Sequence, residues 1–215
     1  MDQYGSFPSQ IREIASLKVA TVVERNTPAA QQTSSADEEQ TSSDTSAKDD
    51  AVTDEVYTIF VSGIDTRGGM TASSRSDVNI ILTLNATTKQ ILMVSTPRDY
   101  FVPLSISNGV PDKLTHAGIY GVNVCMDTLD MLYDININYY FRLNFAGFEQ
   151  IIDALGGVTV NSDYDFDSGN TTGYHFNQGE NHLNGEQALV FARERYAFKE
   201  GDRQRGRNQM AVIQG

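Results

Sequence analysis

The chain lacks the sequence features of several common protein classes. Its single cysteine, Cys125, excludes a disulfide within the chain, and the apolar pattern around it predicts a core position. Positive charge is scarce, because 28 acidic residues outweigh 16 Lys and Arg and leave a formal net charge of −12. This balance argues against nucleic acid as a partner, since phosphate backbones are bound by positive surfaces. No apolar run is long enough for a membrane span or signal peptide.

The composition divides the chain into three parts. Residues 1–29 hold a short apolar piece, interpreted as the remnant of an upstream extracytoplasmic segment. Residues 30–55 are almost wholly Ser, Thr, Gln, Ala and charged residues, which predicts a disordered acidic linker because too little apolar surface can be buried. Residues 56–215 are expected to fold as one domain. This part contains nine of the chain's arginines, the residue best suited to bidentate phosphate binding.

Hydrophobic periodicity predicts an α/β domain in which a central mixed β-sheet is flanked by helices. Strands are expected at 57–64, 78–84, 90–95, 139–143 and 158–160. The clearest helix starts after Asn144 and ends at Gly156 and Gly157, where glycine permits a left-handed cap. Further helices are expected at 185–192 and from 202 onward, and the apolar spacing in 114–133 fits a helix only loosely.

Charged residues recur at a spacing of two near the predicted strand ends. In extended backbone, residues i and i+2 point to the same side, so each pair presents two charges in one direction. Arg193 and Arg195 are therefore expected in extended backbone if both serve one site. The alternative for each pair is a loop salt bridge of little energetic consequence. The three pairs are Asp65 with Arg67, Arg75 with Asp77, and Arg193 with Arg195.

Arginines that converge repel one another and need an anion to hold them together, and pyrophosphate is the natural candidate. Carboxylates among them would then bind a hard cation such as Mg²⁺, which takes one or two carboxylates plus phosphate oxygens. Asp65 and Asp77 are the best candidates for these ligands. The acidic run at 163–167 lacks the glycine and glutamate of an EF-hand and is interpreted as a surface loop. No hydrolase elbow, P-loop or dinucleotide-binding motif is present.

Seven segments together resemble the signature of the LytR-CpsA-Psr family of bacterial cell-envelope proteins, and details are closest to its CpsA-like, capsule-associated branch. The resemblance covers roughly residues 57–215. The segments are 61–67 (VSGIDTR), 74–77 (SRSD), 95–99 (STPRD), 154–158 (ALGGV), 183–189 (LNGEQAL), 191–195 (FARER) and 201–209 (GDRQRGRNQ).

The resemblance implies an apolar pocket for a polyprenyl chain and an arginine-rich mouth for its pyrophosphate. By motif position, the catalytic residues are Arg75, Asp77, Arg98, Arg193 and Arg195. The same four arginines, with Arg205 and Gln209, would bind substrate, while Asp65 and Asp77 would hold Mg²⁺ or Mn²⁺. Asp99, Asp202 and Arg205 also match family positions from which they could orient the arginines.

The implied reaction moves a capsular polysaccharide or teichoic-acid-like polymer from polyprenyl pyrophosphate to peptidoglycan by phosphotransfer. Family members usually carry an N-terminal membrane anchor, so the full-length parent is expected at the membrane surface, on its extracytoplasmic face. The chain is expected to be a fragment that lacks C-terminal elements of the domain. Two other functions remain open: a non-catalytic module that binds lipid pyrophosphate or wall polymer, and a regulator of envelope gene expression, for which the chain shows no DNA-binding feature.

Overall fold

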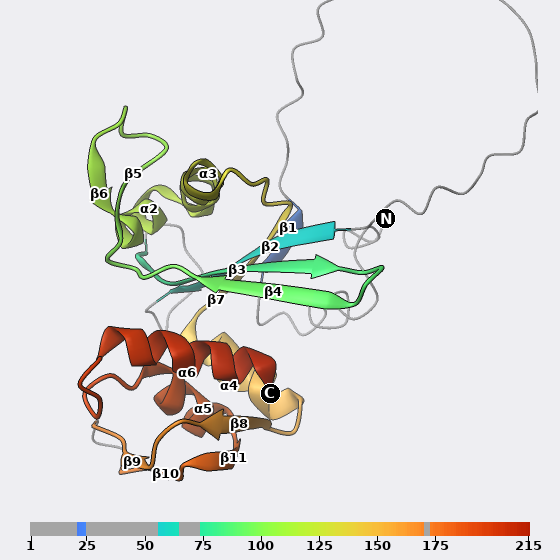
Figure 1. The fold of residues 1–215 in the computed structure, drawn as a ribbon, viewed down its shortest axis with the longest axis vertical. Helices are drawn as coiled ribbons and strands as arrows, with labels where there is room; N and C mark the ends of the chain where they lie inside the picture. Colours follow the sequence, from blue (N-terminus) through green and yellow to red (C-terminus); the bar gives the residue numbers. More distant parts are fainter. Residues whose placement is uncertain (1–20, 25–55, 65–73, 170–172) are drawn as a thin grey trace, which may run out of the picture.

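A computed structural model describes residues 21–24, 56–64, 74–169 and 173–215 (Figure 1). Its centre is a five-stranded sheet in the order β1-β7-β2-β3-β4. The pairings are antiparallel except that of β2 with β7, which is parallel, so the predicted central mixed sheet is confirmed. The strands are β1 (Thr21–Glu24), β2 (Val56–Ile64), β3 (Ser76–Asn85), β4 (Gln90–Ser95) and β7 (Tyr139–Leu143).

Alternation along the strands gives the sheet two apolar faces. In β2, Phe60 belongs to the core on one face, whereas its neighbour Val61 lines a cavity on the other. Ile81 and Ile80 divide in the same way in β3. A sheet that is apolar on both faces must be covered on both faces, and helices cover each of them (Figure 1).

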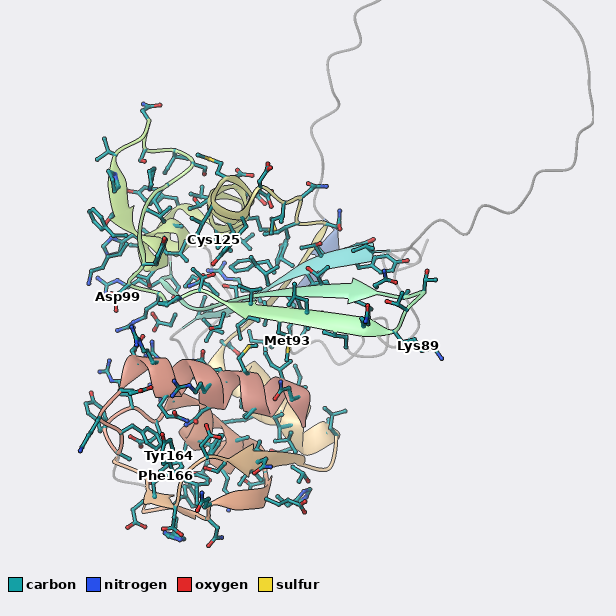
Figure 2. The ribbon with its side chains drawn as sticks, viewed as in Figure 1. Lys89, Met93, Asp99, Cys125, Tyr164 and Phe166 are labelled. Atoms are coloured by element: carbon teal, nitrogen blue, oxygen red, sulfur yellow. The ribbon has the colours of Figure 1, made fainter. Side chains whose placement is uncertain are left out.

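The first face is covered by α2 (Leu114–Tyr120) and α3 (Val122–Tyr133), with the short hairpin of β5 (Phe101–Pro103) and β6 (Pro111–Lys113) beyond them. The loosely periodic stretch 114–133 is thus two helices, because Gly121 has φ of 117° and interrupts the helical backbone. Cys125 is 1% exposed in this core, as the sequence predicts, and lies between α3 and the sheet (Figure 2).

The second face looks toward α4 (Phe145–Ala154), α5 (Gly185–Arg193) and α6 (Asp202–Gln214). These helices share a second core with four short strands. The Asn144 side chain accepts a hydrogen bond from the Gly147 N–H at the start of α4, and Gly156 and Gly157 follow its end with positive φ, as predicted. The strands are β8 (Val158–Ser162), β9 (Phe166–Asp167), β10 (His175–Phe176) and β11 (Gly179–Leu183).

Of the N-terminal region, residues 1–55, the structure describes only β1. β1, which the sequence analysis did not predict, pairs with β7 at the sheet edge, whereas the rest of 1–29 and the predicted linker 30–55 lie outside the described residues. The acidic run at 163–167 has its three aspartates exposed, although Phe166 between them is buried in β9. Among the described residues, no helix has the length and hydropathy needed to cross a bilayer.

Candidate functional site

A cavity of about 280 Å³ lies between the sheet and the helices α4, α5 and α6. This volume is near the lower end of the range for small-molecule pockets, roughly 300–1,000 Å³. Most of its wall is aliphatic or aromatic, which suits a hydrocarbon ligand. The apolar lining consists of Val61, Ile64, Val78, Ile80, Leu143, Phe145, Phe148, Leu189, Ala192, Val212 and Ile213.

Polar residues from distant parts of the sequence line the same cavity. Asp77 comes from β3, Arg98 from the segment after β4, Arg193 and Arg195 from the end of α5, and Arg205 and Gln209 from α6. All six are residues that the sequence analysis assigned to the site. The structure therefore brings four arginines to one apolar cavity, an arrangement that matches an amphipathic anion better than a purely apolar ligand.

Asp77 and Arg98 form the pair that joins the sheet to the loop after β4. Arg98 Nη1 donates to Asp77 Oδ1 at 3.0 Å, and the Thr115 hydroxyl donates to the same oxygen at 3.3 Å. Burial alone would lower the pKa of Arg98, but the carboxylates of Asp77 and Asp99 outweigh it and raise that pKa. Among the described residues, Arg98 Nε has no hydrogen-bond partner, although it forms an ion pair with Asp99 Oδ2 at 3.5 Å. Arg98 therefore keeps one buried hydrogen-bond donor that is unpaired within the described residues.

Asp99 lies beside the N-terminal end of α6 (Figure 2) and is held by a second cation. Lys113 Nζ donates to Asp99 Oδ1 at 2.8 Å. The hydrogen bond from Lys113 is the main cause of a lowered pKa at Asp99, and Arg98 adds to it. Asp99 thus fits the orienting role that its motif position implies, because it contacts Arg98 without lining the apolar cavity.

Arg205 is more enclosed than Arg98, whose side chain is 26% exposed. The Arg205 side chain is 12% exposed, and its Nη2 lies 2.8 Å from Asp202 Oδ1 one turn earlier in α6. Burial lowers the pKa of Arg205, the nearby charges of Arg98 and Arg195 lower it further, and Asp202 opposes them. These cations repel one another in the free protein, so a bound anion would stabilise the arginine cluster by relieving that repulsion.

The backbone at Arg193 and Arg195 differs from the sequence prediction. Arg193 is the last residue of α5, so the expectation that both residues lie in extended backbone is wrong for it. The helix ends because Glu194 takes φ −65° and ψ 132°, and this break lets both arginines line the cavity. Arg193 stacks over the Phe145 ring at 4.1 Å, and Arg195 donates to the Tyr196 hydroxyl at 2.7 Å.

A wider groove of about 930 Å³ adjoins the first cavity. It is bounded by α6, by the segment after β4 and by residues of β8, and the two cavities share Asp77, Arg98, Arg205 and Gln209. Its other lining residues include many hydroxyl, amide and charged side chains. Arg98 and Arg205 thus stand at the junction of the apolar cavity and the wider groove.

One described residue that the sequence analysis assigned to the site is not brought into this cluster. Arg75 is exposed and is not among the residues lining either cavity. Asp65 and Arg67 lie outside the described residues. Conversely, the sequence analysis missed Thr115, Phe145 and Tyr196. Only Tyr196 had a local signal, an aromatic ring next to Arg195, while Thr115 and Phe145 meet their partners through tertiary contacts.

The described residues do not form a complete metal cage. Within the described ranges, no three His, Cys, Asp or Glu side chains group closely enough to hold a metal ion. Asp77 nevertheless suits a cation that also binds phosphate, because its two hydrogen bonds with described residues both fall on Oδ1 at the cavity wall. Mg²⁺ needs only one or two carboxylates in such sites.

The chain matches a known protein family. The model of the LytR_cpsA_psr family matches residues 19–215. The polyisoprenyl-teichoic acid–peptidoglycan teichoic acid transferase TagU of Bacillus cereus is 38% identical over 161 residues, which are 74% of this chain and 51% of the relative. The chain thus spans about half the length of the curated relatives it matches.

Solved structures agree with the sequence comparison. The crystal structure of Bacillus subtilis TagV has a TM-score of 0.66 at 32% identity, covering 74% of this chain and 63% of the other. The LytR-CPS2A-psr family protein YwtF (TagT) with bound octaprenyl pyrophosphate lipid has a TM-score of 0.63 at 32% identity, covering 75% and 63%. With the family signature, the α/β fold and the arginine-lined cavity in agreement, the chain belongs to the LytR-CpsA-Psr family.

Proposed function

We propose that this domain transfers a phosphate-linked glycopolymer, such as capsular polysaccharide or a teichoic-acid-like polymer, from a polyprenyl pyrophosphate carrier to peptidoglycan. The observation that carries the proposal is the joint lining of one cavity by eleven apolar side chains and by Arg98, Arg193, Arg195 and Arg205. An apolar tail with a doubly charged head matches both parts. The relatives named as teichoic acid transferases, and the TagT structure with octaprenyl pyrophosphate, support the same ligand class.

The reaction would use the junction between the two cavities. The isoprenoid tail occupies the apolar cavity, the pyrophosphate lies among the arginines, and the carrier's glycan extends into the wider groove, where polar side chains are available to it. An acceptor hydroxyl oxygen on peptidoglycan attacks the sugar-linked phosphorus and loses its proton. The bond between that phosphorus and the bridging oxygen breaks, and polyprenyl phosphate leaves. Catalysis is then mainly positioning and stabilisation of charge by fixed guanidinium groups.

Each polar residue has a distinct part in this proposal. Arg205 and Arg98 neutralise the pyrophosphate, with Asp77 and Asp202 setting the direction of their guanidinium groups. Arg193, Arg195 and Gln209 complete the mouth. Arg75 keeps the phosphate-binding role that its motif implies, although it is exposed and stands outside the cavity lining.

A divalent cation, Mg²⁺ or Mn²⁺, would be held by Asp77 and by Asp65, which lies outside the described residues. When bound, the cation supplies additional neutralisation of the phosphate oxygens. Because metal and arginines act on the same charges, the two contributions need separate measurements. The parent protein would work at the extracytoplasmic membrane surface, where lipid-linked carriers and peptidoglycan meet.

The experiment that tests the proposal combines binding with turnover. The domain is titrated with geranylgeranyl pyrophosphate with and without Mg²⁺, and the release of polyprenyl phosphate from a lipid-linked glycan is followed with peptidoglycan as acceptor. Asp77→Asn keeps an Oδ1 acceptor for Arg98 but removes the carboxylate charge. Lost turnover with retained binding supports a metal-assisted enzyme. Full metal-dependent turnover in Asp77→Asn contradicts the metal role, and binding without any turnover in the wild type favours a non-catalytic module.

A further inference from the structure

Glu194 is an acidic residue buried between two arginines of the cavity mouth. It is 0% exposed, whereas Arg193 on one side is exposed and Arg195 on the other is partly exposed. Charged side chains are almost never fully buried unless their charge is compensated, because removing a carboxylate from water is costly. The compensation for Glu194 therefore shows what the residue does in this fold.

Four backbone N–H groups donate to the Glu194 carboxylate. Oε1 accepts from Arg195 at 2.9 Å, from Tyr196 at 2.6 Å and from Ala197 at 3.0 Å, and Oε2 accepts from Gly169 at 2.7 Å. Hydrogen bonds to an ionised acceptor are roughly twice as strong as neutral ones. The carboxylate thus fixes three consecutive peptide groups after α5 and ties them to the segment that follows β9.

This turn determines where the two arginines point. On a continuing helix, side chains two residues apart diverge by about 200°. Because α5 ends at Arg193 and Glu194 is extended, Arg193 and Arg195 both line the cavity while Glu194 faces the interior. Gly169 packs against the same turn: a Cβ there would lie 2.8 Å from Tyr196 Cβ and 3.1 Å from Glu194 Oε1. Only glycine leaves this contact unstrained.

We propose that Glu194 is a positioning residue for the pyrophosphate site. It acts through the backbone of residues 194–197, holding Arg193 and Arg195 so that both face one ligand, and it does not itself touch the substrate. Its role rests on the proposed function, since the arginines are assigned there to the pyrophosphate. The eleven apolar side chains that line the cavity all lie outside residues 194–197, so loss of Glu194 should affect the charged head of a ligand and spare its tail.

The test compares two ligands that share a tail. Glu194→Gln keeps the size of the side chain and one acceptor oxygen, but it removes the charge and sets an amide against the Gly169 N–H. Dissociation constants are measured for geranylgeranyl pyrophosphate and for geranylgeraniol, with Glu180→Gln, an exposed change in β11, as the matched control. We expect Glu194→Gln to weaken pyrophosphate binding roughly ten- to a hundredfold and to leave geranylgeraniol binding unchanged. Gly169→Ala, which crowds the turn from the other side, should show the same selectivity.

Two results overturn the proposal. One is equal weakening of both ligands in Glu194→Gln, which would reveal a general structural role, and the other is unchanged binding of both. Amide hydrogen exchange gives a readout without any ligand: exchange at Arg195, Tyr196 and Ala197 should accelerate in Glu194→Gln, and unchanged exchange at all three refutes the positioning role. Failure of the wild type to bind geranylgeranyl pyrophosphate would instead count against the proposed function, so the two ideas fail separately.

Discussion

Replacing Arg205 by methionine should change stability and ligand affinity in opposite directions. Methionine approximates the length and apolar stem of arginine but carries no charge. The guanidinium of Arg205 is enclosed, with its side chain 12% exposed, and burial together with the charges of Arg98 and Arg195 lowers its pKa. Its charge is therefore unfavourable in the free protein and becomes favourable only when an anion binds.

The magnitudes follow from the surroundings of the side chain. Replacing a buried ion pair by apolar groups is often neutral or stabilising by about 1–4 kcal/mol. Here only one partner is removed, but Asp202 is 40% exposed and lies in the first turn of α6, where a negative charge is favourable. We therefore expect Arg205→Met to stabilise the free domain by about 0–1 kcal/mol, a rise of up to roughly 4 °C in Tm. Loss of a buried charged contact should cost about 2–5 kcal/mol in pyrophosphate affinity, or roughly 30- to 4,000-fold.

Two measurements on the same samples test this reasoning. Calorimetric unfolding gives the stability of the free domain, and isothermal titration with geranylgeranyl pyrophosphate gives the affinity. Lys89→Met, which removes a positive charge at the tip of the β3–β4 hairpin (Figure 2), is the control and should change neither quantity by much. A variant that loses stability by more than about 1 kcal/mol while binding the ligand as tightly as the wild type would refute the assignment of Arg205 to the anion site.

Three further predictions concern other parts of the domain. Arg75→Ala should abolish glycopolymer transfer while the circular dichroism spectrum stays native; retained turnover would remove Arg75 from the site. Asn184→Ala should lower the free energy of unfolding by about 1 kcal/mol, because the Asn184 side chain accepts from the Gln187 N–H in a reciprocal cap of α5, and chemical denaturation checks this. Cys125 should resist iodoacetamide at pH 8 in the native protein and react in denaturant, since burial raises the pKa of its thiol to about 12; rapid native alkylation would show that α3 opens readily.

The sequence analysis located most elements because their signals are local. Asn144 and the glycines at 156 and 157 mark the two ends of α4, and alternating apolar residues mark β2 and β3. It failed where the deciding contact is distant. β1 becomes a strand only by pairing with β7, which lies more than a hundred residues later in the chain. No local sequence pattern indicates that pairing. The stretch 114–133, whose spacing fits a helix only loosely, is a local exception, since the positive φ of Gly121 divides it into two helices.

The candidate site shows the same division at the level of single residues. Arg98, Arg193, Arg195 and Arg205 could be selected from motif resemblance, since residue type and spacing are properties of the sequence. The sequence could not show that these four arginines lie close together in space. Their proximity requires the loop after β4, the end of α5 and the first turns of α6 to meet beneath the sheet. The backbone at Arg193 was predicted wrongly for this reason, because the turn there is set by the buried contacts of Glu194.

By itself, the sequence determined the chemical inventory of this protein: its family, its α/β class, the excess of arginine among its cations and the exclusion of a disulfide. These properties follow from composition and from short sequence motifs, which do not depend on how the chain is arranged in space. Only the tertiary structure decided which arginines share a cavity, that the cavity is apolar behind them, and that Arg75 stands outside its lining. Such facts depend on packing between segments up to about 150 residues apart, and local sequence patterns do not specify which distant segments meet.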